Sequence, residues 1–217
     1  MIYWPIYRLS QAGITDILLI TNKDELSFFI ALLGGGEELG VNLTYQIQES
    51  AKGIADGVSL AKDFVKNDKF IVMLGDNIFE DNIKPFVKEF ELQDSGGKVL
   101  LKQVNDPHRY GIPSINFEKQ RIESITEKPE NPESNYCVTG IYFYDSKVFS
   151  IINEINPSIR GELEITDVNN EYIEKSKLSF NMLEGWWIDA GTHDSLFQAN
   201  SYVFNNLEKF LPGGSTI

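Results

Sequence analysis

The sequence predicts an α/β fold in which a mixed central sheet is flanked by helices. In the first half of the chain, short apolar runs alternate with segments of helical periodicity, a pattern typical of a mostly parallel sheet with helices on its faces. In the second half, strand-like segments follow one another with turns between them, and two helices come after. We therefore expect an α/β half that leads into a mixed sheet.

Four segments define the first half. Residues 16–20 (DILLI) and 69–74 (KFIVML) are continuous apolar runs, which favour buried strands. Residues 43–48 (LTYQIQ) alternate like a strand, whereas residues 54–65 place apolar side chains at helical spacing. Strand and helix therefore alternate along this part of the chain.

The remaining elements follow from the same periodicities. We expect helices at residues 83–91, 165–175 and 194–207, and strands at residues 98–104, 111–117, 121–127, 137–144 and 178–183. The expected organisation is one domain over residues 1–210, followed by a frayed tail over residues 211–217.

The composition is that of a globular protein with a strong negative charge. Hydrophobic residues make up 42% of the 217 residues, and the formal net charge is −13. This charge argues against nucleic acid and against an anionic membrane surface as partners, but a few basic groups and a divalent cation can still hold a small phosphorylated substrate. There is no membrane-length apolar run or secretory signal, and the single cysteine, Cys137, is expected in the core, so we expect a cytoplasmic protein.

Two aspartates stand where ligands collect in α/β proteins. Asp76 follows the strand at residues 69–74, and a carboxylate at the carboxyl end of a parallel strand can hold Mg²⁺. Asp189 precedes a turn and a helix for which Thr192 is the expected N-cap. Each aspartate is equally a good turn residue, and the sequence alone does not show whether the two meet.

A polar loop lies between the strand at 43–48 and the helix that follows it. Gln48 can recognise the edge of a base from this position, and Gly53 allows close approach to the backbone, although an ordinary polar loop is the alternative. The glycines at 34–36 are not a phosphate loop, because no Lys-Ser/Thr follows them. His108 and His193 lack the spacing of metal ligands.

Charged residues end one expected strand and begin one expected helix. Glu127 and Lys128 suit a phosphorylated sugar, since an acid can accept hydroxyl hydrogen bonds and an amine can pair with phosphate, but a solvated ion pair is the commoner case. Arg160 can clamp a phosphate, while Glu162 and Glu164 fit ordinary capping of the helix that follows.

Seven short segments occur in a fixed order: MIYWPI (1–6), LGDNIF (74–79), DPHRYG (106–111), EKP (127–129), NYCVTGIYFYD (135–145), RGELEITD (160–167) and DAGTHDSL (189–196). Together they resemble the bacterial glucose-1-phosphate thymidylyltransferases. The resemblance extends to about Val203 and is far more specific than any one segment. It implies a Rossmann-like nucleotidyltransferase fold.

The resemblance also implies a reaction and a site. The reaction joins dTTP and α-D-glucose 1-phosphate to give dTDP-glucose and pyrophosphate, by direct attack of the sugar phosphate on the α-phosphorus; the product usually feeds deoxysugar synthesis, such as that of L-rhamnose for surface polysaccharide. By position, Asp76 and Asp189 would hold Mg²⁺, Gln48 and Gly53 would contact thymine, Tyr110, Gly111, Glu127, Val138 and Tyr142 would line the sugar site, and Lys128 and Arg160, the catalytic pair, would bind phosphate.

The chain departs from the family's pattern at both ends. The family begins with a strand and a glycine-rich loop containing an essential Arg, which should lie immediately before Met1. We expect their absence to impair triphosphate binding and to leave a gap between the strands at 16–20 and 69–74. Pro113 stands where the family prefers another apolar residue and is expected to remove a hydrogen-bond donor from its strand. The C-terminal extension that bears allosteric or oligomer contacts in longer members is also lacking.

Several alternatives stay open. The same fold can serve a uridylyl- or cytidylyltransferase, or another hexose 1-phosphate. A non-catalytic sugar-nucleotide-binding relic is a different class of protein that the same residues allow. A metal-dependent glycosyltransferase is disfavoured, because such enzymes carry an acidic pair one residue apart, whereas Asn77 and Ile78 follow Asp76. A homo-oligomer stays an alternative to a monomer.

Overall fold

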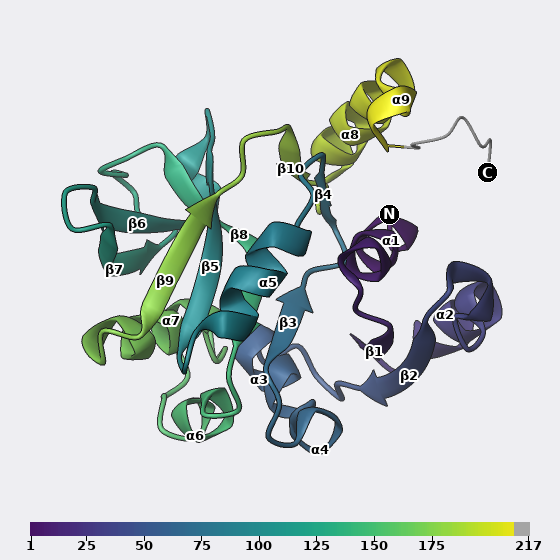
Figure 1. Cartoon of the computed structure of the whole chain (residues 1–217), viewed down its shortest axis with the longest axis horizontal. Helices are drawn as coiled ribbons and strands as arrows, with labels where there is room; N and C mark the ends of the chain where they lie inside the picture. Colours follow the sequence, from purple (N-terminus) through teal and green to yellow (C-terminus); the bar gives the residue numbers. More distant parts are fainter. Residues whose placement is uncertain (211–217) are drawn as a thin grey trace.

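The structure, a computed structural model, describes residues 1–210 and shows a mixed sheet flanked by helices (Figure 1). The α-helices are α1 (Tyr3–Ala12), α2 (Leu26–Leu33), α3 (Ile54–Ser59), α4 (Lys62–Val65), α5 (Lys84–Leu92), α6 (Val148–Ile152), α7 (Ile165–Glu174), α8 (His193–Asn205) and α9 (Leu207–Phe210), with short 3₁₀ helices at Glu37–Leu39 and Pro107–Arg109. The strands are β1 (Asp16–Thr21), β2 (Asn42–Ile47), β3 (Phe70–Met73), β4 (Asn77–Phe79), β5 (Gly97–Gln103), β6 (Gly111–Asn116), β7 (Arg121–Glu127), β8 (Tyr136–Tyr144), β9 (Leu178–Met182) and β10 (Trp187–Asp189). The predicted fold class is confirmed; the predicted tail, residues 211–217, lies outside the described residues.

The largest sheet of the described chain is mixed and has the order β3–β8–β5–β9. β8 runs antiparallel to both β3 and β5, and β9 runs parallel to β5. β1 and β2 form a separate parallel pair, and the expected gap between β1 and β3 is present. The parallel pairing expected in the first half is therefore confirmed for β1 and β2 but not for β3, which takes β8 from the second half as an antiparallel partner. Apolar periodicity identifies a strand but not the direction of its partner.

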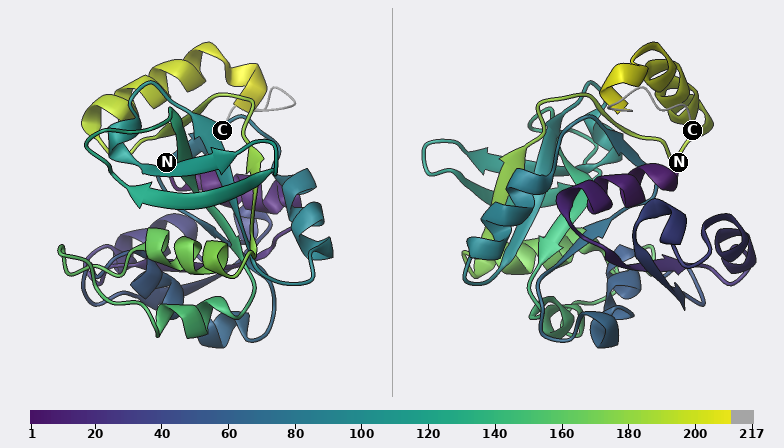
Figure 2. Two further views of the ribbon diagram at one scale, coloured as in Figure 1. Left: turned by 90° about the vertical axis from the view of Figure 1, so that its left-hand side faces the viewer. Right: turned by 45° about the vertical axis from the view of Figure 1, so that its right-hand side comes forward.

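β8 is the centre of the core and sends alternate side chains to its two faces. On one face, Val138 and Tyr142 belong to a cluster that includes residues of α3, α4, α6 and α7. On the other face, Cys137 and Phe143 pack in a cluster that includes residues of α1 and α5. The two views of Figure 2 show these helices around the sheet. The core position expected of Cys137 is confirmed, and burial raises the pKa of its thiol to about 12.

Three helix boundaries have clear local causes. Helix α1, which the sequence analysis did not assign, tolerates Pro5 because that residue lies in the first turn, and it ends at Gly13 with φ 91°. The helix expected at residues 54–65 is divided in two, since the N–H groups of Leu60 and Ala61 bond to carbonyls three residues back and tighten the turn. Thr192 and Ser195 form a capping box at the start of α8, which confirms the predicted N-cap.

Pro113 lies in β6 without the expected loss of a hydrogen bond between strands. Its partner across the ladder is Ile125 of β7. Ile125 directs its N–H and carbonyl away from β6, to the side-chain amide of Asn170 at 2.8 and 2.9 Å. Pro113 therefore occupies a position that exchanges no ladder hydrogen bonds, so its missing donor removes none.

Within residues 1–210 the longest helix, α8, has 13 residues, and no helix combines the length and hydropathy needed to cross a bilayer.

Candidate functional site

Two aspartates meet at the ends of neighbouring strands. Asp76 lies in the turn between β3 and β4, and Asp189 ends β10, where it is paired with Asn77 of β4. The N–H of Ala190 donates to the carbonyl of Asp76 at 2.9 Å and ties the two segments together. The carboxylates converge beside Gly191, where an added Cβ would lie 2.9 Å from Asp189 Oδ1 and 3.0 Å from Asp76 Oδ2. The structure thus brings together two residues whose proximity the sequence left open.

Asn77 orients this pair, and sequence reasoning missed it. Its side chain is 1% exposed. Oδ1 accepts from the N–H of Gly140 at 2.9 Å and from Nε1 of Trp187 at 2.8 Å, while Nδ2 donates to Asp76 Oδ1 at 3.0 Å. A buried amide with both ends bonded fixes the surrounding groups in one arrangement. The only signal in the sequence was an asparagine beside Asp76 in a turn, which does not reveal burial.

The aspartate pair has the electrostatics of a cation site. Burial raises the pKa of Asp76 above its ordinary value of 3.8, and the nearby Asp189 raises it further. A cation between the carboxylates would offset both effects. Among residues 1–210 no three His, Cys, Asp or Glu side chains gather as a metal site. Asp76 and Asp189 can therefore supply two oxygen ligands, leaving the others to water or substrate phosphates, as is usual for Mg²⁺.

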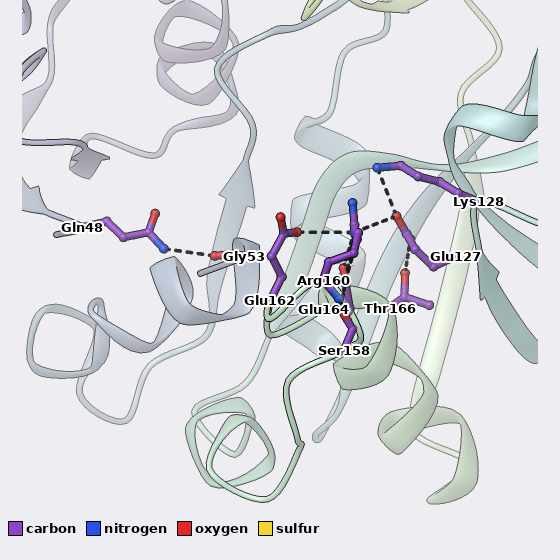
Figure 3. A network of polar contacts seen from close by, with 9 residues as sticks. All are labelled: Gln48, Gly53, Glu127, Lys128, Ser158, Arg160, Glu162, Glu164 and Thr166. Atoms are coloured by element: carbon purple, nitrogen blue, oxygen red, sulfur yellow. Dashed lines mark hydrogen bonds and ion pairs between the residues drawn. The ribbon is translucent and has the colours of Figure 1, made fainter. Parts of the chain in front are cut away.

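A second polar cluster contains Glu127, Lys128 and Arg160 (Figure 3). Glu127 Oε1 lies 3.6 Å from Lys128 Nζ and 3.9 Å from Arg160 Nη2. Glu127 Oε2 accepts from Oγ1 of Thr166 at 2.6 Å. The carboxylate is thus held by Thr166, which sequence reasoning did not single out, while both basic side chains are more than two-fifths exposed and accessible to a ligand.

Lys128 has an unusual backbone. Its φ is 43°, in the left-handed region that lysine rarely adopts, and its N–H donates to the carbonyl of Tyr110 at 3.0 Å. Figure 3 shows its side chain pointing toward Glu127. Such conformations cost on the order of 1–3 kcal/mol and concentrate at functional sites. Lys66, Gln120 and Ser176 also have positive φ, so the backbone conformation by itself does not mark a site, and the position of the ammonium group beside Glu127 is the relevant observation.

Glu162 and Glu164 do not cap α7 as expected. Glu164 occupies the N-cap position, but its side chain makes no capping hydrogen bond. It accepts instead from Arg160 Nη2 at 2.8 Å and from Ser158 Oγ at 2.7 Å, and Glu162 lies 3.4 Å from the same guanidinium. The capping interpretation is wrong because a guanidinium within reach is a stronger partner for a carboxylate than a backbone N–H.

A cavity of about 130 Å³ is lined by Asp189 of the aspartate pair and by Lys128 of the second cluster, whereas Asp76 and Arg160 are not in its lining. Its wall also contains all five residues predicted to line a sugar site, namely Tyr110, Gly111, Glu127, Val138 and Tyr142. Tyr110 packs edge-on against Trp187 with ring centroids 5.5 Å apart. Burial raises the pKa of Tyr110 to about 12, which keeps its hydroxyl protonated and able to donate. The individual roles of these residues stay predictions.

Gln48 and Gly53 lie in the loop from β2 to α3 and line a cavity of about 1080 Å³ together with Glu127, Lys128 and Arg160. Gln48 Nε2 donates to the carbonyl of Gly53 at 3.1 Å and to Asp56 Oδ2 at 2.8 Å. The group that approaches the Gly53 backbone is Leu163, and a Cβ on Gly53 would collide with the Leu163 carbonyl oxygen. Contact of either residue with a base stays a prediction.

The variant Gly53→Ala is expected to lose about 1–3 kcal/mol of unfolding free energy. The residue has φ 99° and no room for a methyl group beside Leu163, so the loop or the Leu163 segment must move. Urea unfolding followed by circular dichroism measures the loss. Gly40→Ala is the matched control, because Gly40 also has positive φ but nothing lies within 4 Å of its added Cβ. Equal losses in both variants would contradict the steric argument.

Comparison with known proteins shows which family this chain belongs to. Residues 1–206 match the model of the family described as nucleotidyl transferase. The glucose-1-phosphate thymidylyltransferase of Neisseria meningitidis is 41% identical over 206 residues, which are 94% of this chain and 71% of that protein. A Bacillus anthracis crystal structure with sucrose, described as a glucose-1-phosphate thymidylyltransferase, is 52% identical with a TM-score of 0.88 and covers 93% of this chain and 81% of that one. A UDP-glucose pyrophosphorylase complexed with UDP-glucose shares the fold, with a TM-score of 0.82 at 20% identity and coverage of 94% and 87%.

Proposed function

Since this chain belongs to the nucleotidyl transferase family, we propose that it forms dTDP-glucose and pyrophosphate from dTTP and glucose 1-phosphate. The observation that carries the proposal is the cavity of about 130 Å³ whose lining includes the five predicted sugar residues, Lys128 and Asp189. The names of the similar proteins support the same substrates. The geometry therefore agrees with a site that binds a phosphorylated sugar beside two carboxylates.

The basic residues would hold the sugar phosphate. Lys128 and Arg160 flank Glu127 on the exposed side of the cluster, where a phosphate can reach both. Binding exchanges part of the ion pairing of Arg160 with Glu164 for ion pairing with the ligand. Glu127, held by Thr166, would accept from sugar hydroxyls, and Tyr110 would donate to them.

Asp76 and Asp189 would hold Mg²⁺, which neutralises charge on the transferring phosphates when bound. The converging carboxylates beside Gly191 and the raised pKa of Asp76 support this placement. Gln48 and Gly53, at the far side of Arg160 in Figure 3, would contact the thymine.

The reaction we propose is a direct displacement. A phosphate oxygen of glucose 1-phosphate forms a bond to the α-phosphorus of dTTP, the bond from that phosphorus to the bridging oxygen breaks, and pyrophosphate leaves with the electron pair. No covalent intermediate with the protein is formed. The chain contributes by holding both phosphates in line and by placing positive groups where charge develops.

The test is pyrophosphate release by the purified chain with dTTP, glucose 1-phosphate and Mg²⁺. Parallel assays with UTP and CTP, and with other hexose 1-phosphates, identify the base and the sugar. Turnover that is fastest with dTTP and glucose 1-phosphate supports the proposal. Binding of dTDP-glucose by a folded chain without any turnover would contradict it and favour a sugar-nucleotide-binding protein.

Arg160→Ala is expected to raise the KM for the sugar phosphate by about 10- to 100-fold, since hydrogen bonds to charged groups contribute about 1.5–3 kcal/mol. The KM for the nucleotide should change much less. Steady-state kinetics with each substrate varied in turn measures the difference. Arg121→Ala is the control, because Arg121 is also exposed and ion-paired, to Glu123 at 3.2 Å, but lies outside both cavities. A similar change in both variants would contradict the proposed role of Arg160 in phosphate binding.

A further inference from the structure

Charged side chains hold the segment that joins β9 to β10, residues 183–186. This segment is neither helix nor strand, yet its four N–H groups and its four carbonyls all have hydrogen-bond partners. Six of these eight groups are bonded by only three side chains, those of Glu80, Asp81 and Lys102. Irregular segments at a protein surface can leave such groups to water, so the three side chains fix this one in a single conformation.

The two carboxylates bind the N–H groups of this segment. Asp81 Oδ1 accepts from the N–H of Glu184 at 3.0 Å, and Asp81 Oδ2 accepts from the N–H of Gly185 at 2.9 Å. Glu80 Oε2 accepts from the N–H of Trp186 at 3.0 Å. A Cβ on Gly185 would lie 2.9 Å from Asp81 Oδ2, so the absence of a side chain there lets the carboxylate approach the backbone.

Lys102 of β5 binds the carbonyls of the same segment. Its Nζ donates to the carbonyls of Leu183 and Glu184, at 3.1 Å each, and to the carbonyl of Gly185. An ammonium group has three donors, and all three are used here. Because hydrogen bonds from charged groups are stronger than those between neutral groups, this half-buried side chain ties β5 firmly to the residues immediately before β10.

The register of β10 decides where Asp189 points. β10 has three residues and pairs with β4 in a two-stranded sheet, with Asp189 opposite Asn77 (Figure 1). A ladder this short is marginally stable alone, and a shift by one residue would turn the Asp189 carboxylate to the other face, away from Asp76. The N–H of Ala190 bonds to the carbonyl of Asp76 at the end of β10, and the 183–186 segment is the anchor at its start.

We propose that Lys102, together with Asp81, is a positioning residue for Asp189. By binding the 183–186 segment, the two side chains fix the register of β10 on β4 and so place the Asp189 carboxylate beside Asp76. Neither side chain lines the cavities of about 130 and 1080 Å³, so both act through the backbone and not by contact with a substrate. The importance of this position for catalysis rests on the proposed function.

The test compares Lys102→Met with Lys69→Met in the whole chain. Methionine keeps most of the apolar stem of lysine but removes its donors. Lys69 is a matched control, because its Nζ also donates to three carbonyls, those of Phe90, Glu91 and Gln93. It precedes β3, whereas Asp76 follows that strand, so the two lie at opposite ends of β3. Both variants should lose similar stability in urea, and only Lys102→Met should disturb Asp189.

Amide hydrogen exchange in metal-free protein measures the positioning directly. In Lys102→Met the N–H of Ala190, which bonds to Asp76, should exchange about 10-fold faster relative to the amides of β8, because β10 opens locally. In Lys69→Met this ratio should not change. Asp81→Asn keeps only one of the two accepting oxygens and should show a smaller change in the same direction, which also provides the test if Lys102→Met does not fold.

Binding of Mn²⁺ then links the position to the aspartate pair. We expect Lys102→Met to raise the Kd for Mn²⁺ by about 10- to 100-fold, as loss of groups that orient metal ligands does, and Lys69→Met to leave it unchanged. An unchanged Ala190 ratio in folded Lys102→Met or Asp81→Asn, or an equal rise in Kd in both lysine variants, would overturn the proposal. A parent chain that binds no Mn²⁺, with Ala190 responding as expected, would support the positioning and contradict the metal site of the proposed function.

Discussion

Replacing Asp76 by asparagine is expected to lower the rate of nucleotidyl transfer by about 10²–10³-fold, which corresponds to about 2.7–4 kcal/mol of transition-state stabilisation. The substitution keeps the shape of the side chain but removes one of the two carboxylate charges that converge beside Gly191. Asp189 alone is expected to bind Mg²⁺ much more weakly than the two aspartates together. Pyrophosphate release at saturating substrates measures the effect.

Binding of Mn²⁺ followed by electron paramagnetic resonance separates this charge effect from misfolding, since it needs no turnover. Asp76→Asn should abolish Mn²⁺ binding in a chain that unfolds at an unchanged or higher urea concentration. Asp24→Asn is the control, because Asp24 is an exposed aspartate between β1 and α2. Full activity of Asp76→Asn would contradict the role of the aspartate pair in the proposed reaction.

The same variant is expected to change how stability depends on pH in metal-free protein. Because the folded-state pKa of Asp76 lies above 3.8, the folded chain binds this proton more readily than the unfolded chain. The stability from this group is therefore fully present below pH 3.8 and is lost as the pH rises through the folded-state pKa. With EDTA present, Asp76→Asn should be more stable than the parent at pH 7, and the difference should shrink toward acidic pH. A difference in urea midpoint that does not vary with pH would contradict this sign.

Replacing Asn77 by alanine is expected to cost about 2–4 kcal/mol of unfolding free energy. The side chain bonds three groups, the N–H of Gly140, Nε1 of Trp187 and the carboxylate of Asp76. Removing it leaves at least two buried donors without an acceptor, and each such loss costs about 1–3 kcal/mol. Urea unfolding monitored by tryptophan fluorescence measures the change and also reports on Trp187 directly.

Asn42→Ala is the matched control for this variant. Asn42 is exposed in β2 and donates one hydrogen bond, to Asp16 at 2.9 Å, so its replacement should change stability by less than about 1 kcal/mol. We also expect Asn77→Ala to impair transfer, because Asp76 loses its orienting donor. If the two alanine variants were equally stable, the buried amide would not be the link between β4, β8 and β10 that the hydrogen bonds indicate.

Much of the fold could be predicted from local patterns. The strands β1, β2, β3, β5, β6, β7, β8 and β9 and the helices α5, α7 and α8 were expected within a few residues of their bounds, because periodicity and turn residues act over short stretches of chain. The family could be predicted as well, since its seven segments are linear and need no folding to compare. Short elements such as β4 and β10 were missed because three residues carry too little periodicity.

The sequence by itself determined the class of fold, the family and the set of candidate site residues, because residue type and local spacing are properties of the chain alone. Only the tertiary structure decided which of these residues meet. It placed Asp76 beside Asp189 and showed that the buried side chain of Asn77 donates a hydrogen bond to Asp76. It also showed that Glu164 pairs with Arg160 instead of capping α7 with its side chain. It also decided the pairing of β3 with β8. Apart from the ion pair between Arg160 and Glu164, which are four residues apart, these outcomes depend on contacts between residues tens of positions apart, and strand periodicity is the same whichever neighbour the strand takes.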